Sequence, residues 1–84
     1  MDIFNIYAVK DELTNKFMEP TFIKDENEAL RLFTYQVNNI DLWKQNSSDY
    51  SLYHIGTYDQ GTGTVIGIQP AKVIGGRSVV KNEA

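Results

Sequence analysis

Cysteine is absent from the sequence, histidine occurs once, and there is no long apolar run. Without cysteine, disulfides, thiolate chemistry and cysteine-based zinc sites are excluded. A single histidine, His54, removes most metal sites and most acid–base pairs. No apolar run approaches the roughly 20 residues that a transmembrane helix requires. The 84 residues, 42% hydrophobic and 23% charged, therefore indicate one small globular domain.

Positive charge is also scarce, with eight basic residues against eleven acidic ones and a pI of about 4.9. Overall charge alone does not hold such an acidic chain to a phosphate backbone. Residues 1–59 carry five basic and ten acidic residues. Residues 60–84 carry three basic residues and one acidic residue. This segment is the only basic stretch, and a solvated tail is its simplest explanation.

The first part of the chain predicts strands. Residues 2–10 are rich in β-branched and aromatic residues, with apolar side chains on both faces. This pattern is typical of a central strand that is covered on two sides. Residues 17–23 are also largely apolar, but Pro20 cannot donate a hydrogen bond to a ladder. We therefore expect a short edge strand or an extended connection there.

One long helix is predicted over residues 26–39, which contain no glycine or proline. Asp25 is a suitable N-cap, and Glu28 stands at the capping-box position. Apolar residues recur at helical spacing and form one face, so the helix should lie over a sheet. That face consists of Ala29, Leu30, Phe33, Val37 and Ile40, with Leu32 at its margin.

The second half predicts a β-hairpin. Residues 39–49 are expected to form a polar loop, and residues 50–58 a strand. Residues 59–63 contain an aspartate and two glycines, which is typical of a hairpin turn. A returning strand is expected over residues 64–68, with Pro70 marking its end.

The order strand, strand, helix, strand, strand predicts an α+β fold. We expect a small, mainly antiparallel sheet of about four strands with one amphipathic helix on one face. Residues 1–70 would form the domain, and residues 71–84 an extended, partly flexible arm. Because the core is small and a sheet edge is free to pair with a second copy, a homodimer is expected.

No motif predicts catalysis, a metal site or a cofactor. Gly61-Thr-Gly63 lacks the lysine of a phosphate-binding loop and leads into a strand, so a hairpin turn explains it better. His54 has no identifiable partner and is expected on a sheet face. The carboxylates are scattered, and nothing singles out a pair.

The tyrosines of the predicted strand have two open interpretations. By simple alternation Tyr50 and Tyr58 share one face with His54, and Tyr53 lies on the other. Exposed strand aromatics can stack on nucleic-acid bases, at about 1–3 kcal/mol each. They can equally cover the core or a dimer contact. No lysine or arginine interleaves with these tyrosines in the sequence.

Several short motifs follow one another in a recognisable order between residue 3 and about residue 75. They are Ile6-Tyr7-Ala8-Val9-Lys10-Asp11, Pro20-Thr21-Phe22, Ala29-Leu30-Arg31-x-Phe33, Asp49-Tyr50-x-Leu52-Tyr53-x-x-Gly56-x-Tyr58-Asp59, Thr62-Gly63 and Pro70-x-x-Val73. In this order the chain resembles the small nonstructural protein of gokushovirus-type microviruses, which are phages with circular single-stranded DNA genomes. The block from Asp49 to Asp59 is the most specific part.

The resemblance implies a non-enzymatic, DNA-binding protein of the host bacterial cytoplasm that acts in viral genome replication or packaging. The resemblance assigns no catalytic residue, and the lack of a long apolar run predicts no membrane association. The alternative is an interaction module that engages phage replication or capsid proteins without binding nucleic acid. If single-stranded DNA is bound, the acidic background leaves few contacts. The candidates are Arg31, Lys72, Arg77 and Lys81 for phosphates and Tyr50 and Tyr58 for bases.

Overall fold

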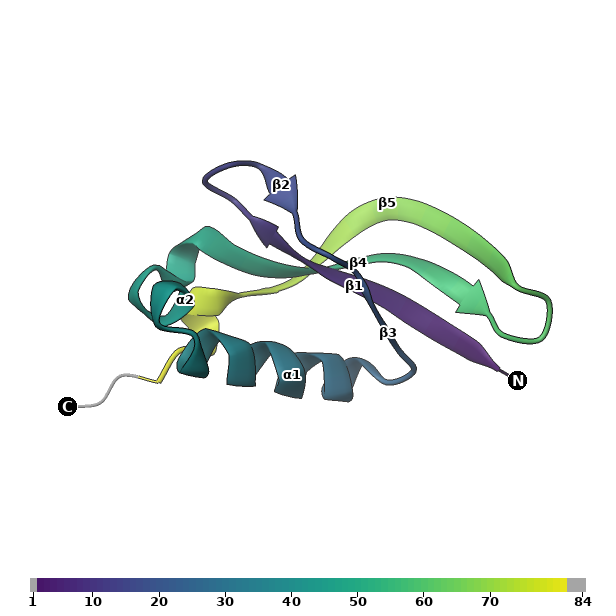
Figure 1. Cartoon of the computed structure of the whole chain (residues 1–84), viewed down its shortest axis with the longest axis horizontal. Helices are drawn as coiled ribbons and strands as arrows, with labels where there is room; N and C mark the ends of the chain where they lie inside the picture. The colour runs from purple at the N-terminus through teal and green to yellow at the C-terminus, as the bar shows by residue number, and fades with distance from the viewer. Residues whose placement is uncertain (1, 82–84) are drawn as a thin grey trace.

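The computed structural model describes residues 2–81, and its main elements are a five-stranded antiparallel sheet and one long helix (Figure 1). The predicted α+β class is confirmed. In chain order the elements are β1 (Ile3–Asp11), β2 (Lys16–Phe17), β3 (Thr21–Ile23), α1 (Glu26–Asn39), α2 (Asp41–Gln45), the 3₁₀ turn η1 (Ser47–Asp49), β4 (Tyr50–Asp59), β5 (Thr64–Gly75) and the 3₁₀ turn η2 (Gly76–Ser78).

Strands β1 and β4 form the centre of the sheet, whose order is β2-β1-β4-β5. β3 also pairs with β1, so both short strands share the edge of β1 that β4 does not occupy. Pro20 lies between these two strands and belongs to neither. The predicted single apolar stretch is thus two short strands, separated where proline removes the ladder donor. β1 is a central strand, as predicted, but the prediction that it is covered on two sides is wrong, because α1 covers only one face of the sheet.

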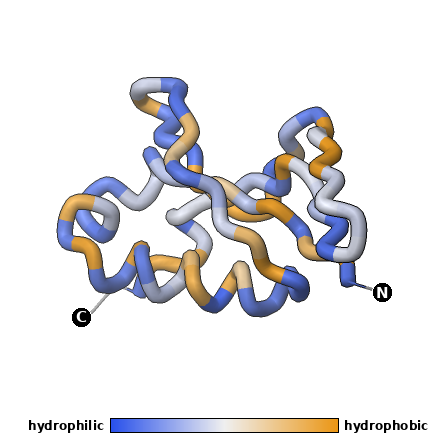
Figure 2. Tube along the Cα trace, turned by 45° about the vertical axis from the view of Figure 1, so that its right-hand side comes forward, coloured by the Kyte–Doolittle hydropathy of each residue, from blue (hydrophilic) through white to orange (hydrophobic). Residues whose placement is uncertain are grey.

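Helix α1 begins where the sequence predicts, because the side chain of Asp25 accepts a hydrogen bond from the backbone N–H of Asn27 at 2.9 Å. Figure 2 shows hydrophobic and hydrophilic residues alternating along this helix. Its buried residues pack against strand residues of β1 and β4 in one apolar core. The buried helix residues are Ala29, Phe33 and Val37, and their strand neighbours in the core are Tyr7, Val9, Tyr50 and Leu52.

The predicted polar loop at residues 39–49 is wrong, because α2 and η1 occupy most of it. Asp41 and Lys44 stand at the amino and carboxyl ends of α2, where their charges complement the helix dipole. Between them Trp43 is buried, and its ring stacks on Tyr50 with centroids 4.8 Å apart. Trp43 is therefore a core residue that closes one end of the domain.

Pro70 does not end the last strand, since β5 continues to Gly75. Gly67 pairs with Gly56 and Ala71 with His54, so three residues of β5, numbers 68–70, lie opposite a single residue of β4. Such a bulge interrupts the ladder, and a proline there removes no regular hydrogen bond.

The predicted domain boundary at residue 70 is also wrong, because the segment from residue 71 to residue 81 is part of the domain. Val79 and Val80 pack against the core. The Asn38 side chain donates to the Val79 carbonyl at 3.0 Å and accepts from the Lys81 N–H at 2.6 Å. Apolar contacts and the Asn38 hydrogen bonds hold this segment against the core, so it is not a solvated arm. Residues 82–84 of the predicted arm lie outside the described residues.

The hairpin turn between β4 and β5 is confirmed. Asp59 accepts from the Gly61 N–H through its side chain at 2.9 Å and from the Gly63 N–H through its carbonyl at 2.7 Å. Gly63 has a φ of 73°, a conformation that glycine adopts without steric cost. The aspartate and the second glycine thus close the turn.

Replacing Phe33 with alanine should lower the free energy of unfolding by about 3–5 kcal/mol, because its ring is 1% exposed at the centre of the core. Leu32→Ala is the matched control on the same helix, since Leu32 is 38% exposed and should cost far less. Urea unfolding measures both. A loss below about 1 kcal/mol for Phe33→Ala would show that this face is not the core.

Candidate functional site

Strand β4 changes its facing at a β-bulge. Ile6 pairs with Gly56, whereas the next residue of β1, Tyr7, pairs with His54, so Ile55 is an extra residue of β4. An extra residue reverses the alternation of side chains beyond it. Tyr58 therefore lies on the opposite face from Tyr50, and the prediction that these two tyrosines share a face is wrong.

Gly56 is required at the bulge by close packing of the backbone. A Cβ atom at this position would lie 2.5 Å from the carbonyl oxygen of Ile66 in β5. Only glycine lets the two strands approach in this way. A glycine inside a predicted strand is the one sequence signal of this feature.

Five aromatic rings gather on the face of the sheet that points away from α1. In the strand register, Phe4 lies beside Tyr58, Phe22 beside Ile6, and Phe17 beside Lys10. Residues that pair across neighbouring strands project to the same side of a sheet. We call this surface the aromatic face, and its rings are Phe4, Phe17, Phe22, Tyr53 and Tyr58.

The rings form two groups along the sheet. At one end, the Tyr58 ring contacts Phe22 edge-on, with centroids 5.5 Å apart, and Phe4 at 6.4 Å. At the other end, Phe17 meets Tyr53 edge-on at 5.3 Å. Phe17 and Phe22 are more than two-fifths exposed, so the rings are held by their neighbours and still reach solvent.

Three lysines stand among these rings. The Lys10 ammonium lies 5.5 Å and 5.6 Å from the centroids of Phe17 and Tyr53, within cation–π range. Lys24, directly after β3, places its ammonium 5.0 Å from the Phe4 centroid. Lys72 of β5 is exposed and pairs in register with Tyr53. The aromatic face therefore combines flat apolar rings with positive charge.

One carboxylate organises the Tyr53 end of the aromatic face. The Tyr53 hydroxyl donates to Glu12 Oε2 at 2.9 Å, and the Lys10 ammonium lies 3.5 Å from Glu12 Oε1. Burial alone would raise the pKa of Glu12, but hydrogen bonds from Tyr53 and Ser51 and the charge of Lys10 lower it overall. Burial and the bond to Glu12 raise the pKa of the Tyr53 hydroxyl. Tyr53 thus remains a neutral donor to an ionised Glu12.

Two of the six candidate DNA-contacting residues, Tyr58 and Lys72, lie on the aromatic face. Tyr50 is 5% exposed and stacked on Trp43, so its proposed contact with bases is wrong. Arg31 is exposed on α1, the helix that covers the other side of the sheet.

Arg77 and Lys81 are exposed at and beyond η2, a turn that packs against α1 and η1. The structure therefore does not bring the two residues, or Arg31, together with the aromatic face.

Sequence reasoning missed most of the aromatic face. Lys10 and Lys24 are far from the tyrosines in the sequence, and only the pairing of β1 with its neighbours brings them together. Tyr53 was predicted on the face opposite Tyr58, and the bulge places the two together. Gly56 was the available signal, because a glycine within a strand often marks a bulge.

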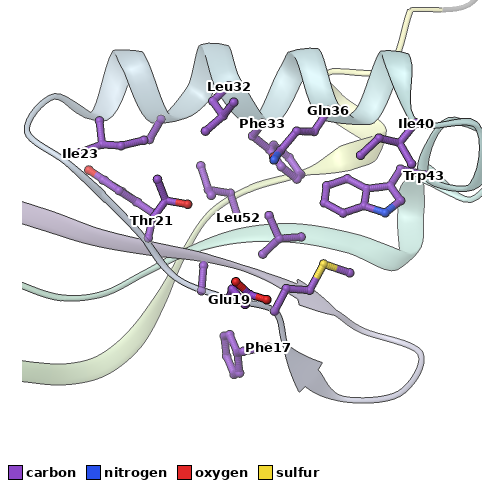
Figure 3. A pocket seen from close by; sticks show the side chains of 15 residues that line it. Phe17, Glu19, Thr21, Ile23, Leu32, Phe33, Gln36, Ile40, Trp43 and Leu52 are labelled. Atoms are coloured by element: carbon purple, nitrogen blue, oxygen red, sulfur yellow. The ribbon is translucent and has the colours of Figure 1, made fainter.

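A cavity of about 580 Å³ opens on the other side of the sheet, between α1 and the segment that contains β2 and β3 (Figure 3). Its lining is mainly apolar, and Glu19 and Gln36 are polar exceptions. In Figure 3, Leu32 and Ile40 extend from the helix, and Trp43 closes one end. The arrangement suits an apolar guest more than a charged one.

The described residues contain no other arrangement that indicates chemistry. His54 lies on the helix side of the sheet with its ring 5.2 Å from that of Tyr7, and its buried Nε2 has no hydrogen-bond partner. Between residues 2 and 81, no three metal-ligating side chains come together. In the same part of the chain, no helix is both long and apolar enough to cross a membrane.

A family model described as Phage ORF5 protein matches residues 4–79 of the chain. The match includes β4, α1, all of β1 except Ile3, and every residue of the aromatic face. No curated protein and no solved structure is significantly similar to the chain.

The Glu12 contacts predict a pH-dependent component of stability. Because folding lowers the pKa of Glu12 from its ordinary value of 4.5, the stabilisation is present above that pH and is lost as the pH falls through the folded-state pKa. In Glu12→Gln this component should be missing. The difference in unfolding free energy between wild type and variant should therefore be largest near neutral pH and shrink below about pH 4.5.

Urea unfolding at a series of pH values measures this difference. Glu19→Gln is the control, because within the described residues the exposed Glu19 makes no hydrogen bond or ion pair. A difference for Glu12→Gln that stays constant with pH would contradict the prediction.

Proposed function

The chain belongs to the Phage ORF5 protein family, and we propose that it acts as a nonstructural phage protein that binds single-stranded DNA through the aromatic face. The observation that carries the proposal is the placement of Lys10, Lys24 and Lys72 among the rings of that face. Proteins that bind single strands without sequence preference combine aromatic rings for the bases with basic side chains for the backbone.

Stacking would supply the larger part of the affinity. Each base stacked on an aromatic ring contributes about 1–3 kcal/mol. Phe22 at one end of the face and Phe17 at the other are the most accessible of its rings, at 47% and 42% exposure. Two separate groups of rings suit a strand that runs along β1 and meets one group after the other.

Phosphate contacts would be few. Three lysines neutralise at most about three phosphates, which corresponds to a salt slope near −2 for a single strand. Glu12 is held by Lys10 and Tyr53, so its charge is already compensated in part. The acidic remainder of the chain acts over only about 8 Å at physiological salt. We therefore expect weak, sequence-indifferent binding without catalysis, in the bacterial cytoplasm during genome replication or packaging.

A second candidate function, an interaction module for phage replication or capsid proteins, is favoured by the cavity beside α1. Its rim carries exposed apolar side chains, among them Met18, Leu32 and Ile40. A partner could insert an apolar side chain there without contacting the aromatic face. Binding of this kind would release no counterions, so salt dependence separates the two functions.

Tyr58→Ala should weaken binding of a thymidine oligonucleotide by about five- to 150-fold, because one stacking ring and the support of its neighbours are lost. Tyr35→Ala is the matched control, since Tyr35 is 64% exposed on α1, away from the aromatic face. Fluorescence anisotropy at two salt concentrations gives the affinities and the slope, and circular dichroism verifies the fold.

Equal loss in both variants, or in neither, would exclude the aromatic face as the contact surface. If the wild-type protein binds no oligonucleotide even at low salt, the interaction module becomes the better description of its function.

A further inference from the structure

Strand β5 forms a long open edge of the sheet. It is the last strand in the sheet order, and within residues 2–81 no strand pairs with its outer side. Every residue from 64 to 72 is exposed. The row of backbone N–H and C=O groups along this edge is a ready template for another strand.

The regular part of this edge, residues 64–67, carries none of the usual protection against such pairing. Natural edge strands are blunted by charged side chains, proline or short length. Residues 60–71 include no charged side chain, and Pro70 lies beyond the regular part of the strand at residues 64–67. Val65 and Ile66 are 60% and 57% exposed. The edge is therefore apolar as well as open.

We infer that β5 pairs with β5 of a second copy, antiparallel and around a two-fold axis near Ile66. In a two-fold contact each side chain on the axis meets its own counterpart, so an apolar residue there meets an apolar residue. Ile66 pairs in register with Thr57 and so projects to the helix side of the sheet, where it remains exposed. Ile68, two residues further along, is also exposed.

A second copy explains the exposed isoleucines better than a foreign strand. The two-fold axis would bring Ile66 of one chain against Ile66 of the other and reduce the exposure of both. An 84-residue chain without cysteine has no disulfide to reinforce its small core, and oligomerisation is a common way to bury more apolar surface.

This pairing also enlarges the proposed DNA surface, and that part of the inference rests on the proposed function. A two-fold axis perpendicular to the sheet keeps both α1 helices on one side and both aromatic faces on the other. Six lysines in place of three would double the salt slope for a long single strand, from near −2 to near −4.

The self-association test is sedimentation equilibrium at micromolar concentration. The wild-type chain should sediment at twice its mass of 9.6 kDa. Ile66→Lys places two like charges opposite each other on the axis and should weaken association at least about tenfold. Leu13→Lys makes the same change at an apolar residue that is 78% exposed in the β1–β2 turn, and it should leave the dimer intact.

Cysteine cross-linking tests the register. The chain has no cysteine, so Ile66→Cys introduces a single thiol. Opposed residues in an antiparallel pair lie within the distance that a disulfide spans. Mild oxidation should therefore convert this variant to a covalent dimer, whereas the control Leu13→Cys should form little covalent dimer.

Three outcomes would overturn the pairing: a wild-type monomer, an Ile66→Lys dimer as stable as wild type, or equal cross-linking of the two cysteine variants. The DNA surface has its own readout. Weaker binding and a shallower salt slope for Ile66→Lys support a DNA surface formed by the aromatic faces of both chains. An unchanged slope overturns it. A wild-type dimer that binds no oligonucleotide would contradict the proposed function and leave the pairing of β5 standing.

Discussion

The close approach of β4 and β5 at Gly56 is the constraint on which the two faces of this protein depend. A side chain at Gly56 would collide with the carbonyl oxygen of Ile66, so only glycine fits. The bulge at Ile55 beside it reverses the alternation of β4. As a result, Tyr50 lies in the core against Trp43, and Tyr58 lies on the opposite face of the sheet.

The two faces of the sheet follow different physical rules. On the helix side, apolar contact dominates, and Phe33 and Val37 are almost completely buried. On the other side, rings meet edge-on and lysines lie over them, so the surface remains partly solvated. A cluster of exposed apolar rings is typical of a surface that binds a ligand or a partner. The lysines among these rings are the observation that supports the proposal of a nucleic-acid strand as the ligand.

Local pattern predicted most of the fold and little of the site. The helix, the central strand and the hairpin follow from periodicity, the Asp25 cap and turn residues, all of which act over a few positions. The predicted arm is wrong because a proline usually ends a strand, whereas here a bulge accommodates Pro70 and β5 continues. The site depends on pairing between residues far apart, such as Phe4 with Tyr58, and no short-range pattern contains that information.

Chemical-shift mapping by NMR tests the central claim most directly, namely that the aromatic face contacts single-stranded DNA. The isotope-labelled protein would be titrated with a thymidine oligonucleotide at low salt. We expect the largest shifts at Lys24, Tyr53 and Tyr58, with α1 little affected. Shifts confined to Arg31 on α1 and Arg77 in η2 would contradict the account.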